Sequence, residues 1–164
     1  PQAHNALNME LIREMRKTLR EMQGLRALVL TGEGQTFCAG GDLKWMEEMT
    51  KQEVSGRMKD AEELALMLSE LNRVPFPVIG RINGPAYGGG LGLISCCDIA
   101  IGVESATFSL SEVTLGLIPA TISPYVVKRL GESNARRMML NARRFSAREA
   151  LELGLLHKLS LIHI

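Results

Sequence analysis

Apolar side chains recur along the chain with two spacings, one typical of helices and one typical of buried strands. Between residues 7 and 22 they return every three or four positions with charges between them, and Asn8 and Gly24 are placed to begin and end this predicted helix. The same spacing over 54–71 predicts a second long helix, which the Pro-Phe-Pro sequence after it ends. Short, mainly apolar runs predict four strands, at 25–30, 78–82, 98–102 and 106–110.

Shorter helices are expected between and after these strands, at 43–49, from the glycine cluster through about 97, and at 122–130, 134–141 and 147–153. Ser146 and Glu149 are spaced as a capping box for the last helix, and Gly154 closes it. Strands therefore alternate with helices, which is typical of the α/β class. No repeat, linker or low-complexity segment interrupts the pattern, so we expect one domain over residues 1–158.

The last six residues, 159–164, read LSLIHI and directly follow a helix stop. This hexapeptide matches the in-frame translation of a common transposon-derived sequencing adapter. We therefore expect it to be a non-native tail, and sequencing of the intact source gene tests this expectation.

Composition narrows the class of protein. The chain has 164 residues, of which 46% are apolar and only 4% aromatic, so aliphatic side chains and methionine must fill one core. A formal charge of +1 gives no long-range attraction, and we expect neither nucleic acid nor a membrane as a partner. Three cysteines, two of them adjacent, do not resemble a disulfide pattern and favour a cytoplasmic location. The three histidines have no metal-ligand spacing to a cysteine, so no metal is expected.

Three adjacent glycines stand in the sequence AYGGGLGL at 86–93, where a helix is predicted to begin. A helix N-terminus offers unpaired N–H groups, and glycine lets a ligand atom approach them closely. The sequence FCAGG at 37–41 is a second glycine-bearing turn after a strand. If the fold brings Gly41 and Gly89 together, their two N–H groups form an oxyanion hole. Tight packing is the more common reason for such glycines, and both interpretations stay open.

Other chemical interpretations are weaker. GGGLGL lacks the G-x-G-x-x-G pattern of dinucleotide sites, and no P-loop sequence occurs. Cys38 is a candidate nucleophile, but a buried and inert thiol is the more common case, and Cys96 and Cys97 are expected in the core. Glu112 is a lone acid in the apolar stretch FSLSEVTLGLIP. It is either a carboxylate favoured by a helix dipole or a proton-transfer group beside a partly dry pocket, with a raised pKa.

Four segments occur in an order and spacing that resemble one family. They are FCAGGDL, NGPAYGGGLGLISCCDIAI, FSLSEVTLGLIPA and ALELGLLHKL, and together they span almost the whole chain. The chain resembles the enoyl-CoA hydratase/isomerase family, the crotonases. The resemblance implies a spiral of ββα units that holds an acyl-CoA thioester in a curved cleft, with coenzyme A as part of the substrate and no separate cofactor. The segment LSEVTLGLIPATISPYVVKRLG is most similar to bacterial members that hydrate methylglutaconyl-CoA and related carboxylated enoyl thioesters.

The resemblance also implies roles for residues. It assigns the two oxyanion N–H groups to Gly41 and Gly89, and the catalytic acid/base to Glu112. The positions expected to contact coenzyme A or the acyl group are Ala39, Gly40, Asp42, Leu43, Trp45, Met46, Gly88 and Ile118. Three basic residues are candidates for contacts to the coenzyme A phosphates, with a solvated surface as the alternative, namely Lys44, Lys51 and Arg57.

Two positions depart from family patterns. Members with two catalytic glutamates carry the first where this chain has Gly92, so one of the two carboxylates is absent. We expect Gly92 to leave space there, and the attacking water to be held by other groups or by a carboxylate of the substrate. Thioester dehalogenases carry an aspartate nucleophile where this chain has Ala120, so dehalogenation is not expected.

The sequence thus leaves three functions open. The first is hydration of 3-methylglutaconyl-CoA or a longer isoprenoid relative, in leucine or acyclic terpene breakdown. The second is double-bond isomerisation by one glutamate, and the third is acyl-CoA binding without catalysis. Relatives begin with a hairpin before the segment HNALN and end with a further helical region that builds trimers or hexamers. We expect both regions to be missing here and the full-length protein to be a homotrimer or hexamer.

Overall fold

The computed structural model describes residues 3–160 and confirms the α/β class. Its larger sheet is fully parallel, in the order β1-β2-β4-β7, and is formed by β1 (Leu28–Thr31), β2 (Val78–Ile82), β4 (Ile99–Val103) and β7 (Lys158–Ser160). In the smaller sheet β5 pairs parallel with β3 and antiparallel with β6, and the strands are β3 (Ala86–Tyr87), β5 (Thr107–Ser109) and β6 (Phe145–Ser146).

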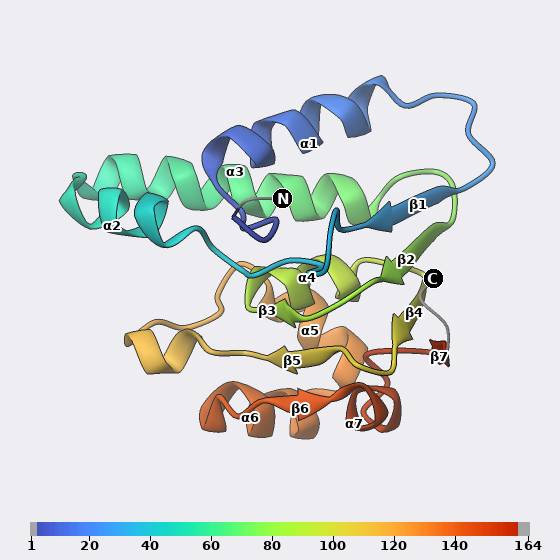
Figure 1. The fold of residues 1–164 in the computed structure, drawn as a ribbon. Helices are drawn as coiled ribbons and strands as arrows, with labels where there is room; N and C mark the ends of the chain where they lie inside the picture. Colours follow the sequence, from blue (N-terminus) through green and yellow to red (C-terminus); the bar gives the residue numbers. More distant parts are fainter. Residues whose placement is uncertain (1–2, 161–164) are drawn as a thin grey trace.

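The helices lie around these sheets (Figure 1). They are α1 (Met9–Glu21), α2 (Leu43–Lys51), α3 (Val54–Asn72), α4 (Gly89–Ser95), the 3₁₀ helix η1 (Glu112–Leu115), α5 (Ser123–Leu130), α6 (Glu132–Asn141) and α7 (Ala147–Glu152). The helices α1 and α3 lie together on one side of the molecule, and α6 and α7 lie on the other. None of the helices within residues 3–160 has the length and apolar character needed to cross a membrane.

One cluster of buried apolar side chains joins both sheets, from Leu7 near the start to Leu156 near the end. The apolar faces predicted for the two long helices pack against this core, since Ile12 of α1 and Leu68 of α3 are fully buried. Asn8 caps α1 as predicted, because its side chain accepts a hydrogen bond from Leu11 N–H at 2.9 Å. The first turns of α3 depart from the prediction, because Met58 is 68% exposed.

A buried cation links α1 to α3. The Arg16 guanidinium donates hydrogen bonds to both carboxylate oxygens of Glu70, at 3.0 and 3.1 Å, and to Glu63 at 2.5 Å. Arg20 also donates to Glu70, at 2.6 and 3.0 Å. Hydrogen bonding from Arg16 lowers the pKa of Glu70. This network satisfies the charge of Arg16, whose side chain is only 10% exposed.

The predicted capping box of α7 forms on one side only. The Ser146 hydroxyl accepts a hydrogen bond from Glu149 N–H at 3.2 Å. The Glu149 carboxylate does not return to the cap, because it accepts hydrogen bonds from the guanidinium of Arg143. That hydrogen bonding lowers the pKa of Glu149.

The expected domain boundary at residue 158 falls within β7. Leu159 pairs with Gly102 of β4, and Ser160 pairs with Val103. The first two residues of the expected non-native tail thus complete the edge of the larger sheet. The remaining four, 161–164, lie outside the described residues.

Candidate active site

The two glycine-bearing turns lie side by side. Tyr87 N–H donates to the Cys38 carbonyl at 2.9 Å, and Cys38 N–H donates to the Pro85 carbonyl at 3.3 Å. The next amide, Gly88 N–H, donates to the Ser109 carbonyl of β5 at 2.9 Å. Backbone pairing therefore fixes the start of α4 between the FCAGG turn and the smaller sheet.

Two of the glycines meet backbone to backbone, and both have a conformation that L side chains avoid. Gly40 has φ +91° and Gly88 has φ +46°. A Cβ on Gly40 would lie 3.1 Å from the Tyr87 carbonyl oxygen and 3.9 Å from the Gly88 Cα. A Cβ on Gly88 would lie 3.9 Å from the Gly40 Cα. Close approach and positive φ together explain why glycine is required at these two positions.

Leu7 supports the neighbouring pair, Gly41 and Gly89. Its N–H donates to the Gly40 carbonyl at 2.7 Å, and its carbonyl accepts from Asp42 N–H at 2.9 Å. In this parallel bridge the N–H of Gly41 itself points away from Leu7. On the other side, a Cβ on Gly89 would lie 2.7 Å from the Leu7 Cδ1. Within residues 3–160 neither the Gly41 nor the Gly89 N–H has a hydrogen-bond acceptor, so both remain available to a ligand.

Glu112 places its carboxylate against the same turn. It is the first residue of η1, three residues after the end of β5, and its Oε1 lies 3.1 Å from the position of a Gly88 Cβ. Its Oε2 is buried and has no hydrogen-bond partner among the described residues. Burial raises the pKa of Glu112, and a hydrogen bond from its own backbone opposes the rise. The predicted direction of this pKa is confirmed, and an unpartnered carboxylate oxygen is suited to proton transfer.

The expectation of free space beside Gly92 is wrong. A Cβ there would lie 2.5 Å from Cγ2 and 2.9 Å from Cβ of Ile122, and 3.6 Å from Cδ2 of Leu68. The reason is that the start of α5 packs directly on α4. The position of the missing family glutamate is therefore filled by an apolar side chain of this chain.

The cysteines are not suited to nucleophilic catalysis. All three are buried, and loss of solvation raises the pKa of Cys38 to about 11. Burial also raises the pKa values of Cys96 and Cys97 to about 12. Thiolates are therefore scarce at neutral pH, and the core role expected for the adjacent pair is confirmed.

Some of the remaining predicted contact residues pack or hydrogen-bond around α2 and Gly41, and the others are exposed. Asp42 caps α2, because its carboxylate accepts hydrogen bonds from Lys44 N–H at 2.9 Å and Trp45 N–H at 3.0 Å. Met46 lies behind Gly41, with its sulfur 3.0 Å from where a Cβ of Gly41 would stand. Trp45 packs on the core, and its indole N–H is buried without an acceptor among the described residues.

Leu43 and Ile118 are 72% and 79% exposed, so neither forms a closed acyl pocket in the described part of the chain. Ala39 is half-buried, and its N–H donates to the His4 carbonyl at 3.0 Å. Of the three basic candidates, Lys51 forms a 2.9 Å ion pair with Glu47. The other two, Lys44 and Arg57, are exposed.

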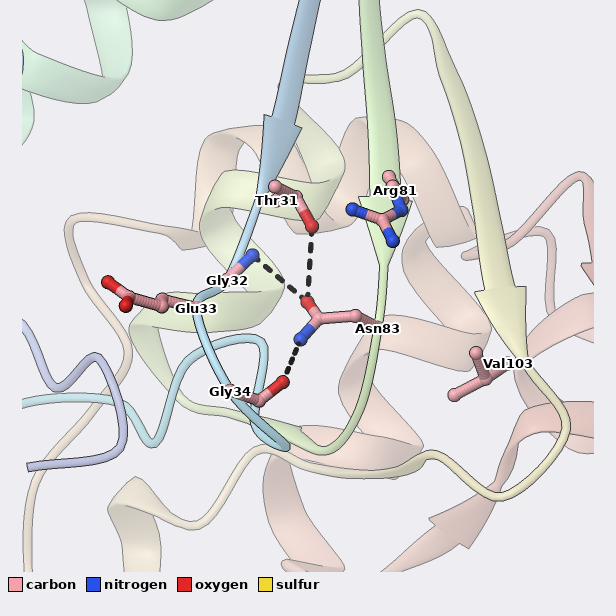
Figure 2. Close-up of a pocket in the computed structure, with 7 residues that line it drawn as sticks. All are labelled: Thr31, Gly32, Glu33, Gly34, Arg81, Asn83 and Val103. Carbon is pink, nitrogen blue, oxygen red and sulfur yellow. Dashed lines mark hydrogen bonds between the residues drawn. The ribbon is translucent and has the colours of Figure 1, made fainter. Parts of the chain in front are cut away.

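A cleft of about 500 Å³ opens away from these residues, at the carboxyl ends of β1, β2 and β4. Figure 2 shows its lining, which consists of Thr31, Gly32, Glu33, Gly34, Arg81, Asn83 and Val103. The Asn83 side chain accepts hydrogen bonds from Gly32 N–H at 2.9 Å and from the Thr31 hydroxyl at 3.3 Å, and it donates to the Gly34 carbonyl at 2.8 Å (Figure 2). These bonds fix the loop that leads to Cys38. Neither Glu112 nor the glycine turns line this cleft.

We did not predict from the sequence that Asn83 supports this loop, nor that Leu7 contacts both glycine turns. For Asn83 a signal exists, because a polar residue before a glycine is typical of a turn. For Leu7 no sequence pattern is informative, because its hydrogen-bonding partners are distant in the sequence. No group of three His, Cys, Asp or Glu side chains within residues 3–160 is placed to share a metal ion.

Comparisons with known proteins agree with this geometry. Residues 1–160 match the family model described as enoyl-CoA hydratase/isomerase. A relative named enoyl-CoA hydratase ACTT6, from Alternaria alternata, is 40% identical over 168 residues, which cover 98% of this chain and 53% of the relative. The chain thus spans about half the length of that relative.

Solved structures show the same fold. An enoyl-CoA hydratase from Shewanella pealeana superposes with a TM-score of 0.93 at 45% identity, over 98% of this chain and 62% of that one. A Legionella pneumophila protein described as an enoyl CoA hydratase/isomerase (crotonase) gives a TM-score of 0.91 at 39% identity, over 96% and 62% of the two chains. The expected crotonase fold is confirmed. Taken with the family match and the paired glycine turns beside Glu112, these comparisons show that the chain belongs to the enoyl-CoA hydratase/isomerase family.

Proposed function

We propose that the full-length protein adds water to an α,β-unsaturated acyl-CoA thioester. The observation that carries this proposal is the carboxylate of Glu112, which lies against Gly88 with one buried oxygen that has no partner among the described residues. Gly41 and Gly89 flank the contact between Gly40 and Gly88, and neither of their N–H groups has an acceptor among the described residues, which supports a role as donors.

Hydration of a conjugated thioester places negative charge on the thioester oxygen as water attacks C3. In the proposed mechanism Gly41 and Gly89 donate hydrogen bonds to this oxygen, and loss of either donor would cost about 3 kcal/mol of transition-state stabilisation. Ionised Glu112 takes a proton from the attacking water, whose oxygen bonds to C3. The protonated carboxyl group then delivers that proton to C2. The balance is one water consumed per thioester, with no separate cofactor.

The substrate class that fits best carries a carboxylate on its acyl chain, as 3-methylglutaconyl-CoA does. Gly92 brings no second acid to the site, and Ile122 closes the space beside it. The task of orienting the water then falls to another group, and a carboxylate on the substrate can accept a hydrogen bond from that water. This substrate would place the protein in leucine breakdown, in the cytoplasm.

A substrate panel on the full-length protein tests the proposal. We expect loss of the enoyl thioester absorbance and incorporation of ¹⁸O from labelled water, faster for 3-methylglutaconyl-CoA than for crotonyl-CoA. Glu112→Gln is the inactive control, and Glu132→Gln on the exposed face of α6 is the matched neutral control. Equal rates on the two thioesters would remove the role of the substrate carboxylate.

Isomerisation is the second candidate, and the same observation of a single acid at the glycine turn favours it. Glu112 alone would move a proton between C2 and C4. A shift of the double bond without ¹⁸O incorporation would identify this reaction. Binding without catalysis is the third outcome of the panel. It is supported if the thioesters are converted no faster by the parent than by Glu112→Ala.

We also propose that the full-length protein assembles as a trimer or hexamer. Large apolar side chains stand exposed on α2, α3 and α6, among them Leu43, Val54, Met58 and Leu140. Exposed apolar groups of this size are a cost for a monomer and are commonly covered in an assembly. Light scattering on the full-length protein would show a mass three or six times that of one chain, and a monomer at micromolar concentration would contradict the proposal.

A further inference from the structure

Ile122 and position 92 compete for the same space. Gly92 is buried in α4, and Ile122 stands directly before α5 with only 2% of its surface exposed. A side chain on residue 92 would begin 2.5 Å from Cγ2 of Ile122, well inside the usual distance between carbon atoms. A carboxylate at 92 and the present Ile122 therefore exclude each other.

Ile122 is not free to move aside. Its carbonyl accepts hydrogen bonds from Tyr125 N–H at 3.1 Å and from Val126 N–H at 3.0 Å, which open α5. Its side chain is branched at Cβ, and that Cβ would itself lie 2.9 Å from a Cβ at 92. No rotation about χ1 removes the overlap with the Cβ atom, so relief requires a shift of α5 or a smaller residue at 122.

Ile122 also lies on the segment that carries the catalytic acid. Glu112 and Ile122 both belong to the connection between β5 and α5, and Leu117 N–H donates to the Glu112 carbonyl at 3.1 Å within it. The connection between β5 and α5 thus carries the Glu112 carboxylate, and its last residue, Ile122, fills the space that a second carboxylate at position 92 would need.

We propose that Ile122 is a specificity-determining residue. It keeps a second carboxylate out of position 92, so the reaction depends on a carboxylate supplied by the substrate. The preference for carboxylated enoyl thioesters rests on the proposed function, whereas the exclusion itself is a property of packing and is tested separately.

The packing test is a double-variant cycle on the full-length protein, with thermal melting as the readout. Gly92→Ala alone is expected to lower Tm by about 2–12 °C, because it overfills a closed site. In the Ile122→Ala background the same substitution is expected to leave Tm unchanged or to raise it, since alanine fills the vacated space and favours the helix. An equal fall in both backgrounds would overturn the exclusion.

Gly90→Ala is the matched control in the same helix. Its Cβ would lie 2.9 Å from the Cys38 carbonyl oxygen, 3.0 Å from the Cys38 Cβ and 3.4 Å from the Ala86 Cβ, so its three nearest neighbours do not include Ile122. We therefore expect Gly90→Ala to lower Tm by the same amount whether residue 122 is isoleucine or alanine. A rescue of this control by Ile122→Ala would show that the smaller side chain relaxes α4 in general, which contradicts a specific exclusion.

The functional test compares Gly92→Glu with Gly92→Glu/Ile122→Gly. The single variant is expected to melt far below the parent, and the double variant to recover part of that loss. In the double variant the ratio of kcat/KM for the carboxylated thioester over crotonyl-CoA should fall at least tenfold. An unchanged ratio in a folded double variant would overturn the specificity role. Failure of the parent on both thioesters would instead overturn the proposed function, while the alanine cycle would still decide the exclusion.

Discussion

Gly88→Ala is the substitution that tests the geometry of the site most directly. Gly88 has φ +46° and ψ −115°, a region that L residues rarely occupy, and holding alanine there costs about 1–3 kcal/mol. For a domain of this size each kcal/mol lowers Tm by about 2–4 °C, so strain alone predicts a fall of about 2–12 °C. The new Cβ would also stand 3.1 Å from Oε1 of Glu112, which must then move by a few tenths of an ångström.

The displacement of Glu112 is expected to reduce activity beyond the effect on stability. We expect kcat/KM to fall by at least about tenfold, or about 1.4 kcal/mol, because proton transfer depends on the position of the carboxylate. Melting curves and a hydration assay on the full-length protein, both at a temperature well below Tm, measure the two effects separately.

Gly131→Ala is the matched control for backbone strain. Gly131 has φ +74° and ψ 156°, also a conformation reserved for glycine, but its Cβ would have no neighbour within 4 Å among the described residues. It should lower Tm by a similar amount and leave kcat/KM unchanged. The reasoning fails if Gly88→Ala keeps full activity, or if Gly131→Ala loses as much activity as Gly88→Ala does.

Three further substitutions or treatments have defined outcomes. Glu112→Gln should lower kcat about 10²–10⁴-fold, and it should melt no lower than the parent at pH 8. Because burial raises the pKa of Glu112, the contribution of its protonated form to the stability of the parent is fully present below the unfolded pKa and is lost as the pH rises through the folded pKa. Any stability advantage of the variant should therefore disappear near pH 4.5 and should not grow on acidification. Arg16→Met should destabilise the protein by about 2–4 kcal/mol, because it removes the guanidinium that pairs with the partly buried Glu63 and Glu70, and an unchanged denaturation midpoint would contradict this. Alkylation with iodoacetamide at pH 7.5 should modify the three cysteines only after denaturation, and rapid labelling of the native protein would show that a thiol is accessible.

The parts of the fold that could be predicted are those whose sequence period extends over several turns or a full strand. The helix predicted over 54–71 is observed at Val54–Asn72, and the strand at 78–82 is observed with the same bounds. The strands β3 and β6 have two residues each and β7 has three, which is too short for a period to be visible. Their pairing depends on partners elsewhere in the chain.

Some features of the candidate site could likewise be predicted from the sequence, and others could not. The direction of the Glu112 pKa followed from an acid placed among apolar neighbours in the sequence, whereas the positive φ that requires glycine at 88 is visible only in the structure. The space beside Gly92 was predicted wrongly, because the sequence does not show that Ile122 would fill it. A missing side chain leaves a hole only when nothing else packs there, and that is decided by the arrangement of α4 and α5.

The backbone of Leu7 has a consequence for how homologous genes are read. Leu7, far upstream of the glycine motifs, contacts both glycine turns, through two main-chain hydrogen bonds to Gly40 and Asp42 and through its Cδ1 methyl group beside Gly89. A gene product that begins after Leu7 would keep every glycine motif in its sequence, but the two glycine turns would lose the contacts that hold them. Motif matches alone would then overstate how many such products are competent enzymes.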